Sequence, residues 1–260
     1  MPKDVEKLMA EVESKVVQDL KKDNLNIMKQ LEKAKKKKED MVDAVYEAVS
    51  ANLRTWDKPS IPKPRNLKKT KDEETAIAVL SDIQLAKVTP EYNSEIAEER
   101  VIAYANKIVD ITNVQRQSHP VNKVAVFAVG DIVEGELIFP GQSHLIDSSL
   151  YKQVTVDGPR IMTQFFDILL ANFNEVDVHW VIGNHGHLGG RSRKDYHPDS
   201  NADRMLGNIM KMVFRDEKRI KFTIPDSTGD NHWFDIADLG KECKFLLWHG
   251  DNVRGFSGFP

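Results

Sequence analysis

Four short polar motifs contain the side chains of this chain that could do chemistry. In chain order they are Ser81-Asp82-Ile83-Gln84, Gly130-Asp131, Gly183-Asn184-His185 and His249-Gly250-Asp251. Each of the first three follows an apolar, β-branched run, and the fourth ends such a run. Carboxylate oxygens, amide oxygens and imidazole nitrogens bind divalent metal ions, and an α/β fold places such ligands at the exposed ends of its parallel strands. The motifs therefore predict a metal centre at one edge of a sheet.

The prediction depends on the conjunction of the motifs. Taken singly, an Asp after a strand, a Gly-Asp pair and an Asn-His pair are all common at ordinary turns. Asp82, Asp131 and Asn184, however, each follow a buried strand and are spaced about fifty residues apart. A sheet would gather their side chains along one edge.

The segments that must position these residues alternate between strand and helix patterns. Buried strands are predicted at 75–81, 124–129 and 176–182, helices at 94–117, 151–173 and 201–214, and short strands at 220–224, 232–236 and 244–248. Ser94 is expected to cap the first of these helices. Strand-helix alternation followed by consecutive strands predicts a layered α/β domain with a mixed sheet, which we place at residues 73–260.

Residues 1–55 are predicted to form a helical arm. Residues 3–53 contain no Gly or Pro and are rich in Lys, Glu, Leu and Ala, which favours helix. A 3-4 alternation of mostly apolar residues between Val17 and Ala48 indicates a coiled coil, and so a homodimer through this arm. The alternative is a helix that packs on its own domain. A basic linker with three prolines, residues 56–72, follows the arm and favours an extended segment.

Composition restricts the compartment and the partners. No apolar stretch is suited to secretion or long enough to span a membrane, so we expect a cytoplasmic protein that does not bind membranes. The single cysteine, Cys243, cannot form an internal disulfide and is expected to pack in an apolar stretch. Residues 1–72 have a net charge of +5, from 18 Lys/Arg and 13 Asp/Glu, whereas residues 73–260 have -8, from 19 and 27. A basic arm suits a polyanion such as nucleic acid, and the alternative is a solvated helix face.

The motif set resembles that of the calcineurin-like metallophosphoesterase superfamily. The family pattern is Asp-x-His, Gly-Asp, Gly-Asn-His followed by Asp or Glu, then His, then Gly-His-x-His, and the resemblance covers about residues 75–260. It implies a sandwich of mixed sheets flanked by helices, with two divalent metal ions. By this likeness Asp131 would bridge both metals, Asp82 would bind the first, and Asn184 and His249 would bind the second. His185 would be the catalytic residue beside the scissile phosphate.

The chemistry of such a centre is consistent with these roles. Two adjacent divalent cations lower the pKa of a shared water and stabilise an in-line displacement at phosphorus. A histidine that protonates the leaving oxygen typically contributes a factor of about 10² to 10⁴. Mixed oxygen and imidazole ligands favour Mn²⁺, with Mg²⁺, Fe or Zn²⁺ as alternatives.

The sequence departs from the family pattern at three points. Gln84 occupies the usual histidine position, where its amide oxygen would be a weaker ligand of the first metal. Gly186 replaces the acidic residue that often orients the motif histidine. The sequence ends at Pro260 before any Gly-His-x-His, so we expect a domain truncated at its C-terminus. Because Gln84 and the missing motif affect the same position, the first metal site is expected to be weak or empty.

The leading functional hypothesis is a metal-dependent phosphodiesterase acting on nucleic acid, similar to the DNA-repair exonuclease branch of the superfamily. Arg191 and Arg193, in the loop after His185, are candidate phosphate contacts, and His187 is a candidate substrate contact. Glu134 is expected on the same rim as the metal ligands. A phosphomonoesterase or nucleotide phosphodiesterase would use the same metals, and fold does not decide the substrate. The alternative from another class is a degenerate, non-catalytic interaction protein.

Overall fold

The computed structural model describes residues 29, 61–64, 73–189, 197–228, 231–240 and 243–251. The chain divides into two compact units, Met1–Ala51 and Asn52–Pro260. Apart from Lys29, which is helical, the predicted arm lies outside the described residues, and so does its coiled-coil pairing. Residues 61–64 of the predicted linker lie in neither a helix nor a strand. All features below belong to the second unit.

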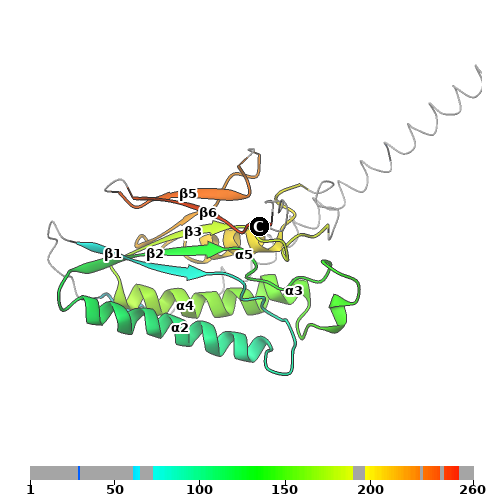
Figure 1. The fold of residues 1–260 in the computed structure, drawn as a ribbon, viewed down its shortest axis with the longest axis horizontal. Coiled ribbons are helices and arrows are strands. Elements are labelled where there is room, and N and C mark those ends of the chain that lie inside the picture. Colours follow the sequence, from blue (N-terminus) through cyan, green and yellow to red (C-terminus); the bar gives the residue numbers. More distant parts are fainter. Residues whose placement is uncertain are drawn as a thin grey trace, which may run out of the picture. The chain divides into compact units, whose positions relative to one another are not determined.

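A parallel four-stranded sheet forms the centre of this unit (Figure 1). Its strands are β1 (Glu74–Leu80), β2 (Val121–Val129), β3 (Glu175–Val181) and β4 (Ile220–Thr223), in that order across the sheet. The helices between them are α2 (Ser94–Gln115), α3 (Leu150–Lys152), α4 (Gly158–Asn172) and α5 (Ala202–Val213), with a short 3-10 turn at Gln142–His144 and a π-helical turn at Gln153–Asp157 between α3 and α4. The α/β class predicted from the sequence is confirmed.

The last two strands form a sheet of their own. β5 (Phe234–Asp238) and β6 (Lys244–Trp248) pair antiparallel with each other, and β4 pairs parallel with β3. The strand pattern predicted a mixed sheet, but among the described residues neither sheet is mixed, because one sheet is wholly parallel and the other is an antiparallel pair. They pack face to face, because a cluster of Ala125, Phe127, Val181, Ala237 and Leu247 is buried between them.

The two faces of the central sheet have different covers. Alternate residues of a strand point to opposite faces, so Val124, Val126 and Ala128 of β2 face away from Ala125 and Phe127, and all five are buried. Helices α2, α4 and α5 cover one face and the β5-β6 pair the other (Figure 1). Burial on both faces explains the nearly continuous apolar sequence of β2. The layers leave the carboxyl ends of the strands at one edge.

The N-terminus of α2 differs from the prediction by one residue. Asn93, not Ser94, is the N-cap, and its side-chain oxygen accepts a hydrogen bond from the Ile96 amide at 2.9 Å. The Ser94 amide and hydroxyl instead donate to the two carboxylate oxygens of Asp147 at 2.8 and 2.6 Å. Both residue types are good caps, and the position of Asp147 decides which one is used.

Cys243 also differs from the prediction, because it is exposed. It lies in the turn before β6, where its amide donates to the Gly240 carbonyl and its own carbonyl accepts from the Leu239 amide. A turn residue at the end of a two-stranded sheet has no layer above it, so the apolar sequence that follows does not bury it. No helix among the described residues is long and apolar enough to cross a membrane.

A buried charged cluster ties the β5-β6 sheet to the central sheet. His179 of β3 is 6% exposed, its Nδ1 lies 2.6 Å from Asp235 Oδ2 of β5, and its Nε2 lies 3.8 Å from Asp177 Oδ2. Burial opposes protonation of the imidazole, but the two carboxylates outweigh it and raise the pKa of His179 to about 9. The imidazolium therefore bridges the two sheets at neutral pH.

We expect the free energy of unfolding to fall between pH 7.5 and pH 10 because His179 loses its proton. A pKa raised from 6.5 to about 9 on folding contributes stability that is complete below the unfolded pKa and is lost as the pH rises through about 9. The whole contribution is roughly 3 kcal/mol, of which about 2 kcal/mol is lost between pH 7.5 and pH 10. Urea unfolding at pH 7.5 and at pH 10 measures this loss of stability. His179→Gln should remove this part of the pH dependence, whereas His119→Gln, at an exposed histidine, should retain it. Equal pH dependence in all three proteins would contradict the assignment.

Candidate metal centre

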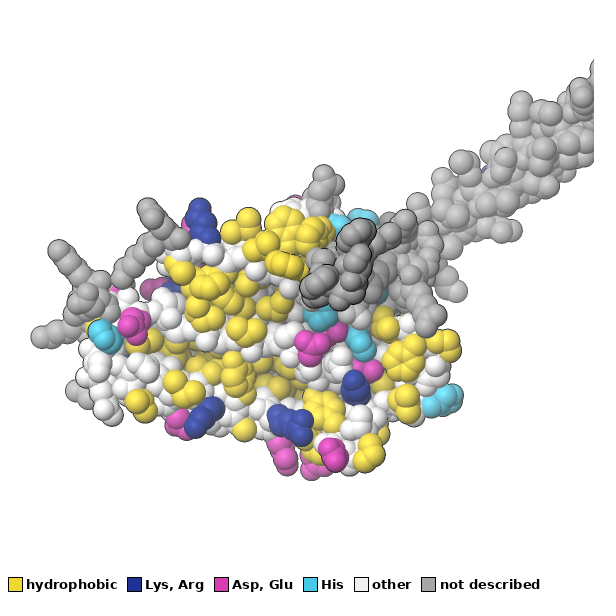
Figure 2. All heavy atoms as spheres, viewed as in Figure 1, with side chains coloured by type: hydrophobic (Ala, Val, Ile, Leu, Met, Phe, Trp, Pro, Cys, Tyr) yellow, Lys and Arg dark blue, Asp and Glu magenta, His cyan; other side chains and the backbone are white. Residues whose placement is uncertain are grey.

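The structure brings four of the sequence-predicted ligands together at the carboxyl edge of the central sheet. Asp82 follows β1, Asp131 follows β2, Asn184 follows β3 and His249 follows β6. One ligand atom from each of Asp82, Asp131 and His249 lies within 4.8 Å of the others. His249 Nε2 is 3.1 Å from Asp131 Oδ2 and 3.1 Å from Asn184 Oδ1. In Figure 2, acidic and histidine side chains adjoin one another at this end of the sheet.

Backbone conformation marks the same residues. Asp82, Gln84 and Asp131 have φ values of 53°, 47° and 53°, in the left-handed region that non-glycine residues rarely adopt. Such conformations persist only where the surrounding structure enforces them, and they cluster at functional sites. Here hydrogen bonds between the two loops enforce them, since the Asp82 amide donates to Gly130 and the Gln84 amide donates to Asp131.

Gly183 allows the second and third motifs to touch. A Cβ at this position would lie 2.1 Å from Asp131 Oδ1 and 2.3 Å from the Asp131 amide nitrogen. Only glycine fits at this distance. The next residues use the proximity, because the His185 amide donates to Asp131 Oδ1 at 2.8 Å. Asp131 Oδ1 is thereby held by the backbone, while Oδ2 faces His249.

Asp203 organises both motif loops, and sequence reasoning did not identify it. This fully buried carboxylate, in the first turn of α5, accepts hydrogen bonds from the amides of Asp131, Ile132, Val133 and Gly183 at 2.9 to 3.2 Å. Burial, and then the charge of Asp131, raise the pKa of Asp203 to about 6, although the amide donors oppose this rise. At neutral pH it is an ionised acceptor for four amides of the site.

Gly186 is explained by the same helix N-terminus. A Cβ at Gly186 would lie 2.6 Å from Asn201 Oδ1 and 2.9 Å from the Asp203 amide nitrogen. Asn201 caps α5 by accepting from the amides of Asp203 and Arg204. No acidic side chain fits at residue 186, because the capped end of α5 fills that space.

Glu134 contacts His185, which the glycine at residue 186 has no side chain to orient. His185 Nδ1 lies 3.0 Å from the Glu134 carbonyl oxygen and 3.1 Å from its Oε2. The hydrogen bond with Glu134 is the largest cause that raises the pKa of His185. His185 Nε2 is 3.9 Å from Asp131 Oδ2. The imidazole is therefore fixed through Nδ1, and its Nε2 is presented to the carboxylate cluster.

His249 is oriented in the same way. Its Nδ1 lies 2.9 Å from the Val129 carbonyl oxygen, which can accept only from a protonated Nδ1 and so directs Nε2 toward Asp131 and Asn184. The hydrogen bond with Asp131 raises the pKa of His249 to about 9, against the effect of burial. The raised pKa means that a proton is favoured between His249 Nε2 and the Asp131 carboxylate. The same position suits a metal cation. Two carboxylates, an amide oxygen and an imidazole form a donor set that fits Mn²⁺.

The other sequence-predicted residues have different surroundings. Gln84 Oε1 accepts a hydrogen bond from Lys87 Nζ at 2.5 Å, and an ammonium group beside this oxygen disfavours a metal ion there. His187 Nε2 lies 3.9 Å from Asp251 Oδ2, at the rim of the fourth motif. Arg191 and Arg193 lie outside the described residues.

Comparisons with known protein families, with curated proteins and with solved structures find no match to this chain. A functional assignment therefore depends on the motifs and on the geometry of the described residues.

Proposed function

We propose that this chain is a metal-dependent phosphoesterase of the calcineurin-like type that hydrolyses phosphodiester bonds in nucleic acid. The observation that carries the proposal is the convergence of Asp82, Asp131, Asn184 and His249 at one edge of a parallel sheet. The packing of two sheets, with helices over the outer face of the central sheet, supports the proposal in part, since the motif resemblance implies sheets flanked by helices.

The residues of the site divide the work of hydrolysis. Divalent metal ions, when bound, lower the pKa of an attacking water and neutralise the phosphate oxygens. Asp131 would hold both ions, Asp82 would hold the first, and Asn184 and His249 would hold the second. His185 donates a proton from Nε2 to the leaving oxygen. Glu134 holds the ring of His185 in position for that transfer.

Metal binding is expected to be unequal at the two positions. At the second position His249 Nε2 lies 3.1 Å from both Asp131 Oδ2 and Asn184 Oδ1, whereas the amide of Gln84 is paired with Lys87. We expect one tightly bound Mn²⁺ per chain after equilibration and desalting at pH 7.5, measured by mass spectrometry of the metal. Two tightly bound equivalents would show that the first position is complete without a histidine at residue 84.

The substrate is tested by direct incubation with nucleic acid. The protein with Mn²⁺ should shorten end-labelled single- or double-stranded DNA, and EDTA should stop the reaction. The basic N-terminal region, with net charge +5 over residues 1–72, supports a polyanionic substrate. Hydrolysis of p-nitrophenyl phosphate without DNA cleavage would instead indicate a phosphomonoesterase.

A non-catalytic interaction protein is the second candidate. The pairing of Gln84 with Lys87 favours it, because it removes a ligand from one metal position. This candidate predicts that no phosphomonoester, phosphodiester or nucleic acid is hydrolysed with Mn²⁺, Mg²⁺, Fe²⁺ or Zn²⁺. Activity lost in Asp131→Asn would exclude it.

A further inference from the structure

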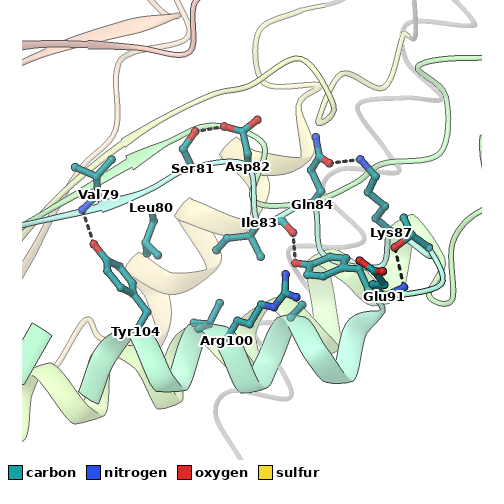
Figure 3. A pocket seen from close by; sticks show the side chains of 14 residues that line it. Val79, Leu80, Ser81, Asp82, Ile83, Gln84, Lys87, Glu91, Arg100 and Tyr104 are labelled. Atoms are coloured by element: carbon teal, nitrogen blue, oxygen red, sulfur yellow. Dashed lines mark hydrogen bonds between the residues drawn. The ribbon is translucent and has the colours of Figure 1, made fainter. Parts of the chain in front are cut away.

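We propose that a cavity between the end of β1 and helix α2 binds one unstacked nucleotide of a single strand, next to the phosphate that is cleaved. The proposal rests on the proposed function and adds a substrate subsite to it. The cavity has a volume of about 550 Å³ and is lined by the end of β1, the loop after it and one face of α2 (Figure 3). Pockets of roughly 300 to 1,000 Å³ hold small ligands in proteins, and a nucleotide is of this class.

The cavity adjoins the candidate metal centre through one shared residue, Asp82. Asp82 and Gln84 line it, and Asp82 also belongs to the carboxylate and imidazole cluster with Asp131 and His249. A phosphodiester held at Asp82 would therefore have a neighbouring nucleoside at the mouth of the cavity.

Two tyrosines supply its aromatic surface. The Tyr92 hydroxyl donates a hydrogen bond to the Ile83 carbonyl oxygen, and the Tyr104 hydroxyl accepts one from the Val79 amide at 3.0 Å. Both hydroxyl groups are thus fixed to β1 or the loop that follows it, which holds the rings in place without a ligand. Aromatic side chains stack on bases of any sequence.

Arg100 supplies a cation to the same space. Its guanidinium lies 5.2 Å from the centre of the Tyr92 ring, and Figure 3 shows it rising from α2 toward the loop after β1. No described carboxylate forms an ion pair with Arg100. A guanidinium placed over an aromatic ring can stack on a base and donate to a phosphate oxygen. Lys87, on the other side of the cavity, adds a second positive charge.

The shape selects a single-stranded ligand. The cavity lies between the end of β1 and α2, and we expect a base to leave its own stack before it packs against the tyrosines there. A paired base would bring its partner and the second backbone against α2. Glu91, also in the lining, offers an acceptor that suits a base amino group better than a second phosphate. We therefore expect single strands, or unpaired ends, to bind in preference to internal duplex.

Arg100→Ala tests the subsite, and Arg215→Ala is the matched control. Arg215 is an exposed arginine that pairs with Asp216 beyond the end of α5. The measured quantity is kcat/KM with Mn²⁺ for a single-stranded oligonucleotide divided by kcat/KM for bis(p-nitrophenyl) phosphate, a diester without a base. We expect this ratio to fall about tenfold in Arg100→Ala, the effect of one stacking or phosphate contact, and to stay unchanged in Arg215→Ala. An unchanged ratio in Arg100→Ala would overturn the proposal.

Equilibrium binding separates failure of the subsite from failure of the proposed function. Fluorescent pentathymidylate is titrated with each protein, with Ca²⁺ in place of Mn²⁺. Weaker binding by Arg100→Ala alone, by about tenfold, supports the subsite even if neither diester is hydrolysed, in which case the proposed catalysis fails by itself. Equal binding by the wild type, Arg100→Ala and Arg215→Ala, or binding of a blunt duplex as tight as that of the single strand, would overturn the subsite.

Discussion

Asp131→Asn is expected to lower the proposed phosphodiesterase activity with Mn²⁺ by about 10³-fold or more, since it removes the charge that both proposed metal positions would share. The change is nearly isosteric. The Asn side-chain oxygen can still accept the hydrogen bond that the His185 amide now donates to Asp131 Oδ1. His249 Nε2, 3.1 Å from Asp131 Oδ2, loses its anionic partner. The loss should therefore appear mainly in kcat, together with fewer metal equivalents per chain by mass spectrometry.

The control for this variant is Asp110→Asn. Asp110 is an exposed carboxylate on α2, and its neutralisation changes the net charge of the chain by the same amount. We expect its activity and metal content to equal those of the wild type. If Asp131→Asn kept full activity on every phosphoester tested, the bridging role of Asp131 would be wrong, and the metal centre would have to be assigned to other residues.

The strand ends could be predicted from sequence because each motif follows a buried apolar run. The rule that parallel strands present their carboxyl ends at one edge then places Asp82, Asp131 and Asn184 together without further information. His249 was placed through the family resemblance. Its approach to Asp131 depends on the packing of the β5-β6 sheet, including the His179–Asp235 contact, and no local pattern records that packing.

Gln84 shows why local sequence is insufficient to predict the first metal position. Its hydrogen bond with Lys87 joins residues only three apart, but the backbone between them is left-handed at Gln84 and Ala86, with φ values of 47° and 84°. Neither residue type favours that region. The conformation comes from pairing with the next loop, where the Gln84 amide donates to Asp131 and the Leu85 amide donates to Ile132.

The sequence around Asp203 indicates a local role at a helix N-terminus and not the tertiary role that the structure shows. The pattern Asn201-Ala202-Asp203 at the start of an apolar-periodic segment indicates a helix N-cap with an acidic first turn, and both features are present. Nothing in it shows that the carboxylate turns away from its own helix to reach loops about 20 and 70 residues earlier. Buried carboxylates that accept several amides are tertiary features, visible only once the loops are assembled.

Asp203→Leu is expected to be the most destabilising single substitution at the site. It would leave the four amides of Asp131, Ile132, Val133 and Gly183 without their acceptor in a buried region. Each unsatisfied buried donor costs about 1 to 3 kcal/mol, so the sum is comparable with the whole stability of a domain. We expect Asp203→Leu to be unfolded, or to unfold at far lower urea concentration than the wild type.

Asp203→Asn separates positioning of the loops from folding as such. The Asn side chain keeps one oxygen, which still accepts hydrogen bonds from two of the four amides. Its NH₂ group faces the other two amides and cannot accept from them. We expect Asp203→Asn to be folded but to have reduced Mn²⁺ affinity and reduced kcat, because the two motif loops move relative to each other. The control is Asp216→Asn, at a carboxylate whose side chain is 73% exposed, and it should match the wild type. If Asp203→Asn bound Mn²⁺ as tightly as the wild type while losing stability, Asp203 would support the fold alone. Reduced metal affinity in a folded Asp203→Asn protein would show that the amides it holds set the distance between Asp131 and Asn184.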